Sequence, residues 1–168
     1  FKQKTAYEIP KRDWSSDVCS SDLFDNFGLL QVMHVMQVEC ATRRVPMTKP
    51  TKIERVETLL WDRWLLVRIY CEDGTVGIGE GGVHGWQRPT QTMLEVMSTY
   101  LRGQDPHRIE HNYQFLYRSS HFMGAVVQGA LSAIDIALWD IKGKRLGVPI
   151  YDLMGGKTRD KVRCYVHV

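Results

Sequence analysis

A four-residue turn, Glu72-Asp73-Gly74-Thr75, is the feature that most restricts how this chain can fold. Glycine tolerates the positive φ that tight hairpins need, and apolar runs flank the turn at Trp64 to Tyr70 and Val76 to Glu80. A looser apolar alternation precedes them, between Lys52 and Leu60. The three segments predict a three-stranded antiparallel meander, which needs a partner to cover its apolar face.

Helical patterns follow the meander and supply that partner. One runs from Pro89 to Gly103, a second begins at Asp105-Pro106, and a third runs from about Val126 to Leu146, ending at Gly147. The third is rich in alanine, so we expect it to pack closely and deeply. The expected fold class is α+β, a meander followed by a helical bundle.

The first 46 residues differ in character from the rest of the chain. They carry six basic and six acidic side chains and show no sustained hydrophobic period. Within them, the run from Asp13 to Leu23 resembles the translation of a widely used DNA-sequencing adapter. We therefore expect residues 1–46 to be non-native sequence, with Met47 as the natural start. A genuine disordered tail is the alternative.

The last segment, Val162 to Val168, has the apolar pattern of a strand, but nothing follows that could pair with it. This suggests a chain cut in the middle of a fold. The sequence thus predicts three parts: residues 1–46, a domain over 47–160, and a first strand of a further unit over 161–168.

Composition argues against several classes of function. The net charge is +3 (22 − 19) with scattered basic residues, which speaks against a nucleic-acid surface. Neither a stretch of about 18 apolar residues nor a signal-peptide pattern occurs, so we expect no membrane partner. The cysteines form no Cys-x-x-Cys motif, and we interpret them as reduced thiols of a cytoplasmic protein.

Three motifs have both a chemical and a structural interpretation. His107 to His111 matches a His-x-x-Glu-His zinc-peptidase pattern, but the polar first turn of a helix explains it as well. Asp135 and Asp140 point in different directions around a helix, which favours separate capping or salt-bridging roles over an acid–base pair. Gly77-x-Gly79 is too short for a dinucleotide fingerprint and lacks the helix that should follow it.

Three stretches together carry a family resemblance: Glu72 to Glu80, Gly103 to Glu110, and Ser132 to Lys144 with its continuation to Gly156. In this order and at these intervals they resemble the N-terminal capping domain of the enolase superfamily. The most similar group is that of the mandelate racemase/muconate lactonizing enzymes, and within it the galactonate and mannonate dehydratases. The resemblance covers residues 52–168.

The resemblance implies a domain that caps the open end of a (β/α) barrel, with residues 161–168 as the first strand of a truncated barrel. It implies a lyase that removes the proton next to the carboxylate of a sugar acid, stabilises the enediolate with Mg²⁺ and then expels the β-hydroxyl. The alternatives are a racemase or cycloisomerase of the same superfamily, and a non-catalytic α+β binding module. We expect the complete enzyme to be a homo-oligomer.

In the family, the metal-binding carboxylates and the catalytic bases come from later barrel strands. We therefore expect this chain to hold no metal and no catalytic residue, and to be inactive alone. The resemblance does assign it two substrate-specificity loops, Trp61 to Trp64 and Gly81 to Gln87. The predicted substrate-binding residues are His84, His167, Arg63 and Trp64. For His84, an exposed loop position without a role is the alternative.

Overall fold

The computed structural model describes residues 49–165. The predicted meander is present as β1 (Ile53–Trp61), β2 (Trp64–Cys71) and β3 (Val76–Glu80). The strands form one antiparallel sheet in the order β1-β2-β3. The meander is therefore confirmed, with each strand within one residue of its expected bounds.

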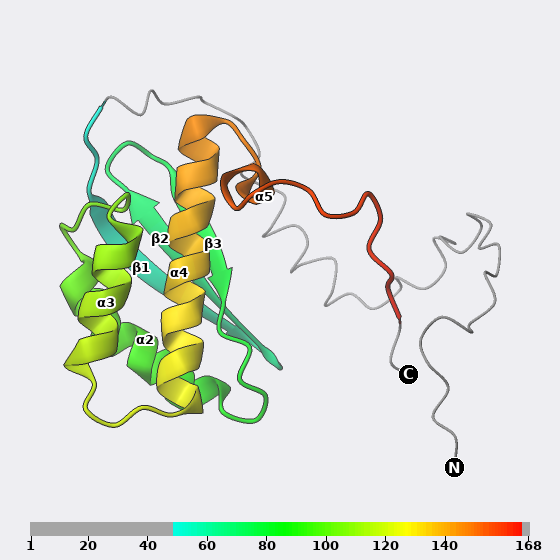
Figure 1. Ribbon diagram of the computed structural model, residues 1–168. Coiled ribbons are helices and arrows are strands. Elements are labelled where there is room, and N and C mark those ends of the chain that lie inside the picture. The colour runs from blue at the N-terminus through cyan, green and yellow to red at the C-terminus, as the bar shows by residue number, and fades with distance from the viewer. Residues whose placement is uncertain (1–48, 166–168) are drawn as a thin grey trace, which may run out of the picture. The chain divides into compact units, whose positions relative to one another are not determined.

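Helices follow the sheet in chain order: α2 (Gln87–Leu101), α3 (Ile109–Ser119), α4 (Ala125–Leu146) and the short α5 (Ile150–Leu153). Figure 1 shows α4 lying across the sheet, with α2 and α3 beside it. The α+β fold class is confirmed. None of the helices between residues 49 and 165 combines the length and the apolar character that crossing a membrane requires.

The core lies between the sheet and the helices. Alternate residues of β2 face it, and Leu65, Val67 and Ile69 are fully buried there. The alanine-rich helix α4 covers β3 so closely that a Cβ built at Gly79 would overlap with the carbonyl oxygen of Ala133. The Gly-x-Gly motif of β3 is therefore a packing feature, because only a residue without a side chain lets the helix backbone approach the strand.

The outer edge of β3 is closed by side chains of α4. The Asp140 carboxylate accepts a hydrogen bond of 2.9 Å from the Ile78 N–H, and Lys144 Nζ donates one of 2.7 Å to the Val76 carbonyl. The two side chains also form an ion pair of 2.8 Å with each other. The structural role favoured for Asp140 is thereby confirmed.

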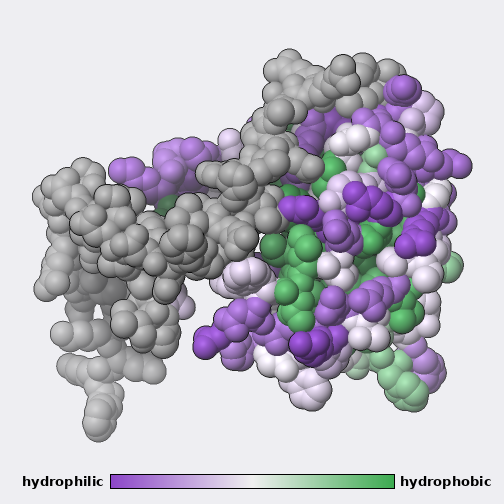
Figure 2. Space-filling model, turned by 180° about the vertical axis from the view of Figure 1, so that it is seen from behind, coloured by the Kyte–Doolittle hydropathy of each residue, from purple (hydrophilic) through white to green (hydrophobic). Residues whose placement is uncertain are grey.

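The face of the sheet turned away from the helices carries a polar network. Tyr70 donates a hydrogen bond of 2.8 Å to Glu57, and the Arg55 guanidinium lies 3.4 Å from the centre of the Tyr70 ring. Figure 2, which shows the molecule from behind, shows apolar residues on this side among polar ones. Leu66 points to this face from β2 and is nevertheless buried.

Two expected boundaries need correction. The second helix does not begin at Asp105-Pro106 but at Ile109, because the Asp105 carboxylate accepts a 2.8 Å hydrogen bond from the His107 N–H and closes a separate turn. Residues 161–165 are exposed and form no strand, and residues 166–168 lie outside the described part. That 161–168 is the first strand of a barrel stays a prediction.

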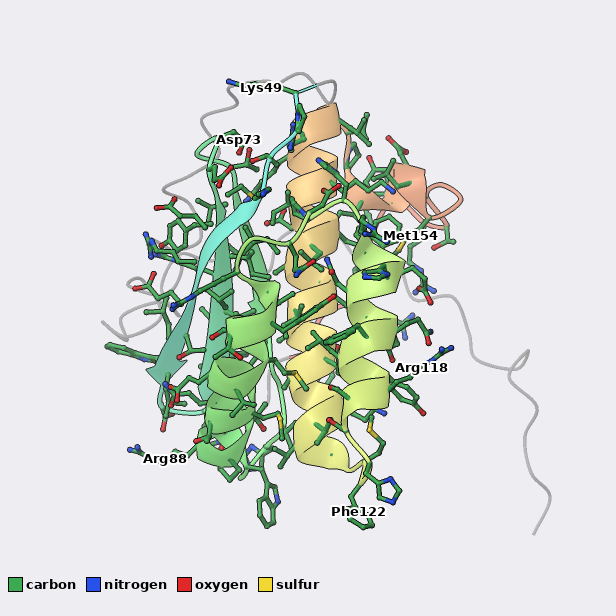
Figure 3. The ribbon with its side chains drawn as sticks, turned by 90° about the vertical axis from the view of Figure 1, so that its left-hand side faces the viewer. Lys49, Asp73, Arg88, Arg118, Phe122 and Met154 are labelled. Carbon is green, nitrogen blue, oxygen red and sulfur yellow. The ribbon has the colours of Figure 1, made fainter. Side chains whose placement is uncertain are left out.

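A buried ion pair fixes the end of the domain opposite the β1–β2 turn. Arg145, in the last turn of α4, has a fully buried side chain that lies 3.4 Å from the Asp73 carboxylate and donates a hydrogen bond to the Lys49 carbonyl. It thereby joins α4, the β2–β3 turn and the segment leading into β1. Figure 3 shows Lys49 and Asp73 at this end and Arg88 and Phe122 at the other.

Candidate functional site

The β1–β2 turn is a tight connection flanked by two tryptophans. Trp61 and Trp64 are cross-strand partners, and each is 46% exposed. Between them Asp62 adopts a φ of +48°, which Asp accepts more readily than most residues. The turn therefore places two indole rings and the exposed Arg63 at one end of the domain.

The loop between β3 and α2 has a defined internal structure. Its first residue, Gly81, donates a hydrogen bond of 2.8 Å to the Leu65 carbonyl of β2. The Val83 N–H then bonds to the Gly81 carbonyl at 2.7 Å, and the Trp86 N–H to the Val83 carbonyl at 3.0 Å. His84, at the centre of this loop, is exposed.

A hydrogen bond connects this loop region to the β1–β2 turn. Gln87, the first residue of α2, donates a hydrogen bond of 3.2 Å from Nε2 to the carbonyl oxygen of Arg63. The two segments predicted to be specificity loops are therefore neighbours in space, although more than twenty residues separate them in the sequence.

The predicted substrate-binding residues are placed as follows. Arg63 has 74% of its side chain exposed and lies 3.9 Å from Asp62, and Trp64 lies beside it on β2. His84 lies in the neighbouring loop. His167 lies outside the described residues. The structure therefore brings three of the four predicted residues to the same end of the fold.

Three further residues of this end belong to the two predicted loops but were not among the four predicted substrate-binding residues. Trp61 pairs with Trp64, Trp86 is 59% exposed just before α2, and Gln87 makes the bond described above. The indole rings had a signal in the sequence, because large apolar residues in turns are candidates for binding. Gln87 was included only as the end of a predicted loop, and nothing in the sequence indicated its hydrogen bond to the Arg63 carbonyl, because the two residues are distant in the sequence.

The His-x-x-Glu-His motif does not form one helical face. His107 precedes α3, so its spacing to His111 is not that of a helical turn, and His111 Nδ1 lies 3.2 Å from Arg108 Nη2. Among residues 49–165, no three or more His, Cys, Asp or Glu side chains gather into a group that could hold a metal ion.

The described groups with shifted pKa values lie elsewhere in the domain. Burial raises the pKa of the Cys71 thiol to about 12, so this thiol stays protonated and is a poor nucleophile. Burial, and then the charge of Arg145, lower the pKa of His107. Burial, and then Glu110, raise the pKa of Asp135.

Comparison with known proteins agrees with this fold. The sequence model of the family described as mandelate racemase / muconate lactonizing enzyme, N-terminal domain, matches residues 36–155. The match begins before Met47, the expected start, and the boundaries at 46/47 and 160/161 stay predictions.

The D-galactonate dehydratase of Pectobacterium atrosepticum is 44% identical over 116 residues, which are 68% of this chain and 30% of that protein. That of Verminephrobacter eiseniae is 46% identical over 104 residues, 61% and 27% of the two chains.

Solved structures show the same domain. A member of the enolase superfamily from Salmonella Typhimurium is similar with a TM-score of 0.64 and 34% identity, over 68% of this chain and 31% of that one. An enolase from Agrobacterium radiobacter with bound sodium and L-malate has a TM-score of 0.62 and 35% identity, over 66% and 29%. The chain thus spans about a third or less of its relatives. It belongs to the mandelate racemase / muconate lactonizing enzyme family of the enolase superfamily, and the part that matches is the N-terminal domain.

Proposed function

We propose that this chain is the N-terminal part of an acid-sugar dehydratase, a lyase that removes water from a sugar acid, and that it supplies the loops that recognise the substrate. Proton abstraction next to the carboxylate and loss of the β-hydroxyl would take place on residues outside the described part. The identity of 44% with a D-galactonate dehydratase carries this proposal, and D-galactonate is the substrate it favours.

The chemistry of the loop end supports a carboxylate- and hydroxyl-bearing ligand. Arg63 and His84 are exposed hydrogen-bond donors, and a guanidinium can bind a carboxylate with two parallel bonds. Trp64 offers an aromatic face beside them. The relative from Agrobacterium radiobacter binds L-malate, a small hydroxy acid of the same chemical kind. We assign His84, Arg63, Trp64 and His167 to the substrate in the complete enzyme.

The described residues do not fit a magnesium site. Mg²⁺ requires several oxygen ligands held in near-octahedral geometry, and no acidic cluster of this kind exists between residues 49 and 165. We propose that the complete enzyme holds Mg²⁺ on residues beyond this domain, and that residues 1–168 alone turn over no sugar acid. A cytoplasmic location and a homo-oligomeric assembly belong to the same proposal.

The test is an assay of the complete enzyme with D-galactonate and D-mannonate. Dehydration would give a 2-keto-3-deoxy acid, because the enol formed by loss of water becomes a ketone. We expect this product, with Arg63→Ala and His84→Ala raising KM about tenfold, because each removes a charge-assisted or polar contact. An epimer or a cyclised product without loss of water would instead identify a racemase or cycloisomerase. Turnover by the 168-residue chain alone would contradict the assignment of catalysis to other residues.

A further inference from the structure

The loop that carries His84 is anchored on α4 by a glycine. Val83 packs its side chain against Gly129, where a Cβ would overlap with Val83 Cγ2. Gly129 lies in the first half of α4 and belongs to none of the helix caps. Glycine in a helix interior costs roughly 0.5–1 kcal/mol relative to alanine, so its presence here fits a position that needs the space.

Thr90 of α2 packs beneath the contact between Val83 and Gly129. Its side chain is fully buried, and its hydroxyl donates a hydrogen bond of 2.8 Å to the Trp86 carbonyl. Its methyl group would lie 3.6 Å from a Cβ at Gly129 and 3.4 Å from one at Gly81. The loop therefore rests on α4 and α2 through Val83 and Thr90, while His84 and Trp86 face solvent.

Gln87 extends this arrangement to the β1–β2 turn. Its hydrogen bond to the Arg63 carbonyl comes directly after the anchored loop, so a shift of the loop would move the donor away from the turn. Through Val83 and Gln87, Gly129 can thus affect the positions of Arg63 and Trp64 as well as that of His84, although it touches none of them.

We propose that Gly129 is a positioning residue for substrate recognition: by receiving Val83 it sets where residues 81–86 lie, and through Gln87 it sets the β1–β2 turn. This inference rests on the proposed function, because it matters for substrate only if these loops bind it. Substrate preference is then set in part from a position on α4.

Hydrogen exchange in the 168-residue chain tests the anchoring. Gly129→Ala should push Val83 out and speed exchange of the Val83 and Trp86 amides about tenfold or more, with the β2 core amides unchanged. Gly124→Ala is the control, since Gly124 is the N-cap residue of the same helix and has nothing within 4 Å of an added Cβ. The double variant Gly129→Ala/Val83→Ala should restore slow exchange, because it removes the methyl groups that collide. Unchanged loop amides, or equal acceleration throughout the domain, would overturn the proposal.

Kinetics of the complete enzyme test the consequence for substrate. Gly129→Ala should raise KM for the sugar acid about threefold to tenfold with little change in kcat, and the double variant should recover part of the loss. If His84→Ala raises KM but Gly129→Ala does not, positioning by Gly129 is wrong and the proposed function stands. If neither raises KM while the loop amides exchange faster, the assignment of substrate to these loops fails, and this proposal fails with it.

Discussion

The two ends of the domain use polar and aromatic residues in opposite ways. At the Arg145 end, the guanidinium and the Asp73 carboxylate are removed from water and bound to each other. At the loop end, Arg63 and the indole rings of Trp64 and Trp86 are held in solvent by short, well-bonded segments. The same 22-residue helix, α4, connects both ends.

The difference shows which residues hold the fold together and which are available for function. A buried charge must keep its partner, so the Arg145 end tolerates little change. Exposed side chains contribute little to folding, so the residues of the loop end can vary while the scaffold persists. Variants should therefore separate into those that lower stability and those that alter binding.

Removal of the buried guanidinium of Arg145 should give the largest loss of stability. Arg145→Met should lower the free energy of unfolding by about 3–5 kcal/mol, because it leaves Asp73 buried without its counter-charge. Chemical denaturation of the 168-residue chain measures this value. Arg63→Met is the matched control at the other end and should change stability by less than about 0.5 kcal/mol. Equal losses in the two variants would remove the distinction between the ends.

An added methyl group between β3 and α4 should give the next largest loss of stability. Gly79→Ala should cost about 1–3 kcal/mol or prevent folding, because its Cβ meets the Ala133 carbonyl rather than a flexible side chain. Gly81→Ala should be tolerated, since its Cβ would meet only side-chain atoms at 3.4 Å or more. Thermal unfolding compares the two. A Gly79→Ala protein as stable as Gly81→Ala would show that the helix can withdraw from the strand without cost.

Lowering the pH should reduce the stability of the domain, because protons bind more readily to His107 in the unfolded chain than in the folded one. Because burial and Arg145 lower the pKa of His107 in the folded state, the unfolded chain binds more protons just below the usual histidine pKa. Stability should therefore fall as the pH drops from neutral through the unfolded value towards the lower folded value, and then level off. His107→Gln should show a smaller loss over the same range in thermal melts. If the stability of the His107→Gln protein depends on pH as strongly as that of the unsubstituted protein, His107 is not the cause of the loss.

Changes at the loop end should have the smallest effect on stability. Trp86→Ala should change the free energy of unfolding by no more than about 0.5 kcal/mol, because more than half of the side chain is already in water. In the complete enzyme the same change should raise KM for the sugar acid if Trp86 borders the ligand. A large loss of stability would show that the indole ring supports the fold.

Much of the fold followed from local patterns. The Gly74 turn and the flanking alternation predict the strands, because hairpin geometry depends on neighbouring residues. The start of α3 was wrong because the Asp105-Pro106 pair, which resembles a helix start, instead closes a turn of its own. Arg145 could not be recognised as buried, since a basic residue in the last turn of a helix is usually exposed and favoured by the dipole.

The residues of the candidate site likewise fall into those that the sequence indicates and those that only the structure shows. Arg63, Trp64 and His84 were predicted from the family resemblance, and the structure brings them to one end. Gln87 and Gly129 act through contacts with residues far away in the chain, for which the sequence gives no periodic signal. Likewise, the Gly-x-Gly pair of β3 could be excluded as a dinucleotide motif, but its close contact with α4 became visible only in three dimensions.

The closure of β3 by Asp140 and Lys144 also bears on how copies of this chain can associate. An uncovered sheet edge is a template for adding strands from other molecules, and so for aggregation. Here the outward N–H of Ile78 and the carbonyl of Val76 are already bonded to the two side chains. A neighbouring copy would have to displace an ion pair before it could add a strand at these positions. Growth of the sheet past β3 is thus opposed at these positions.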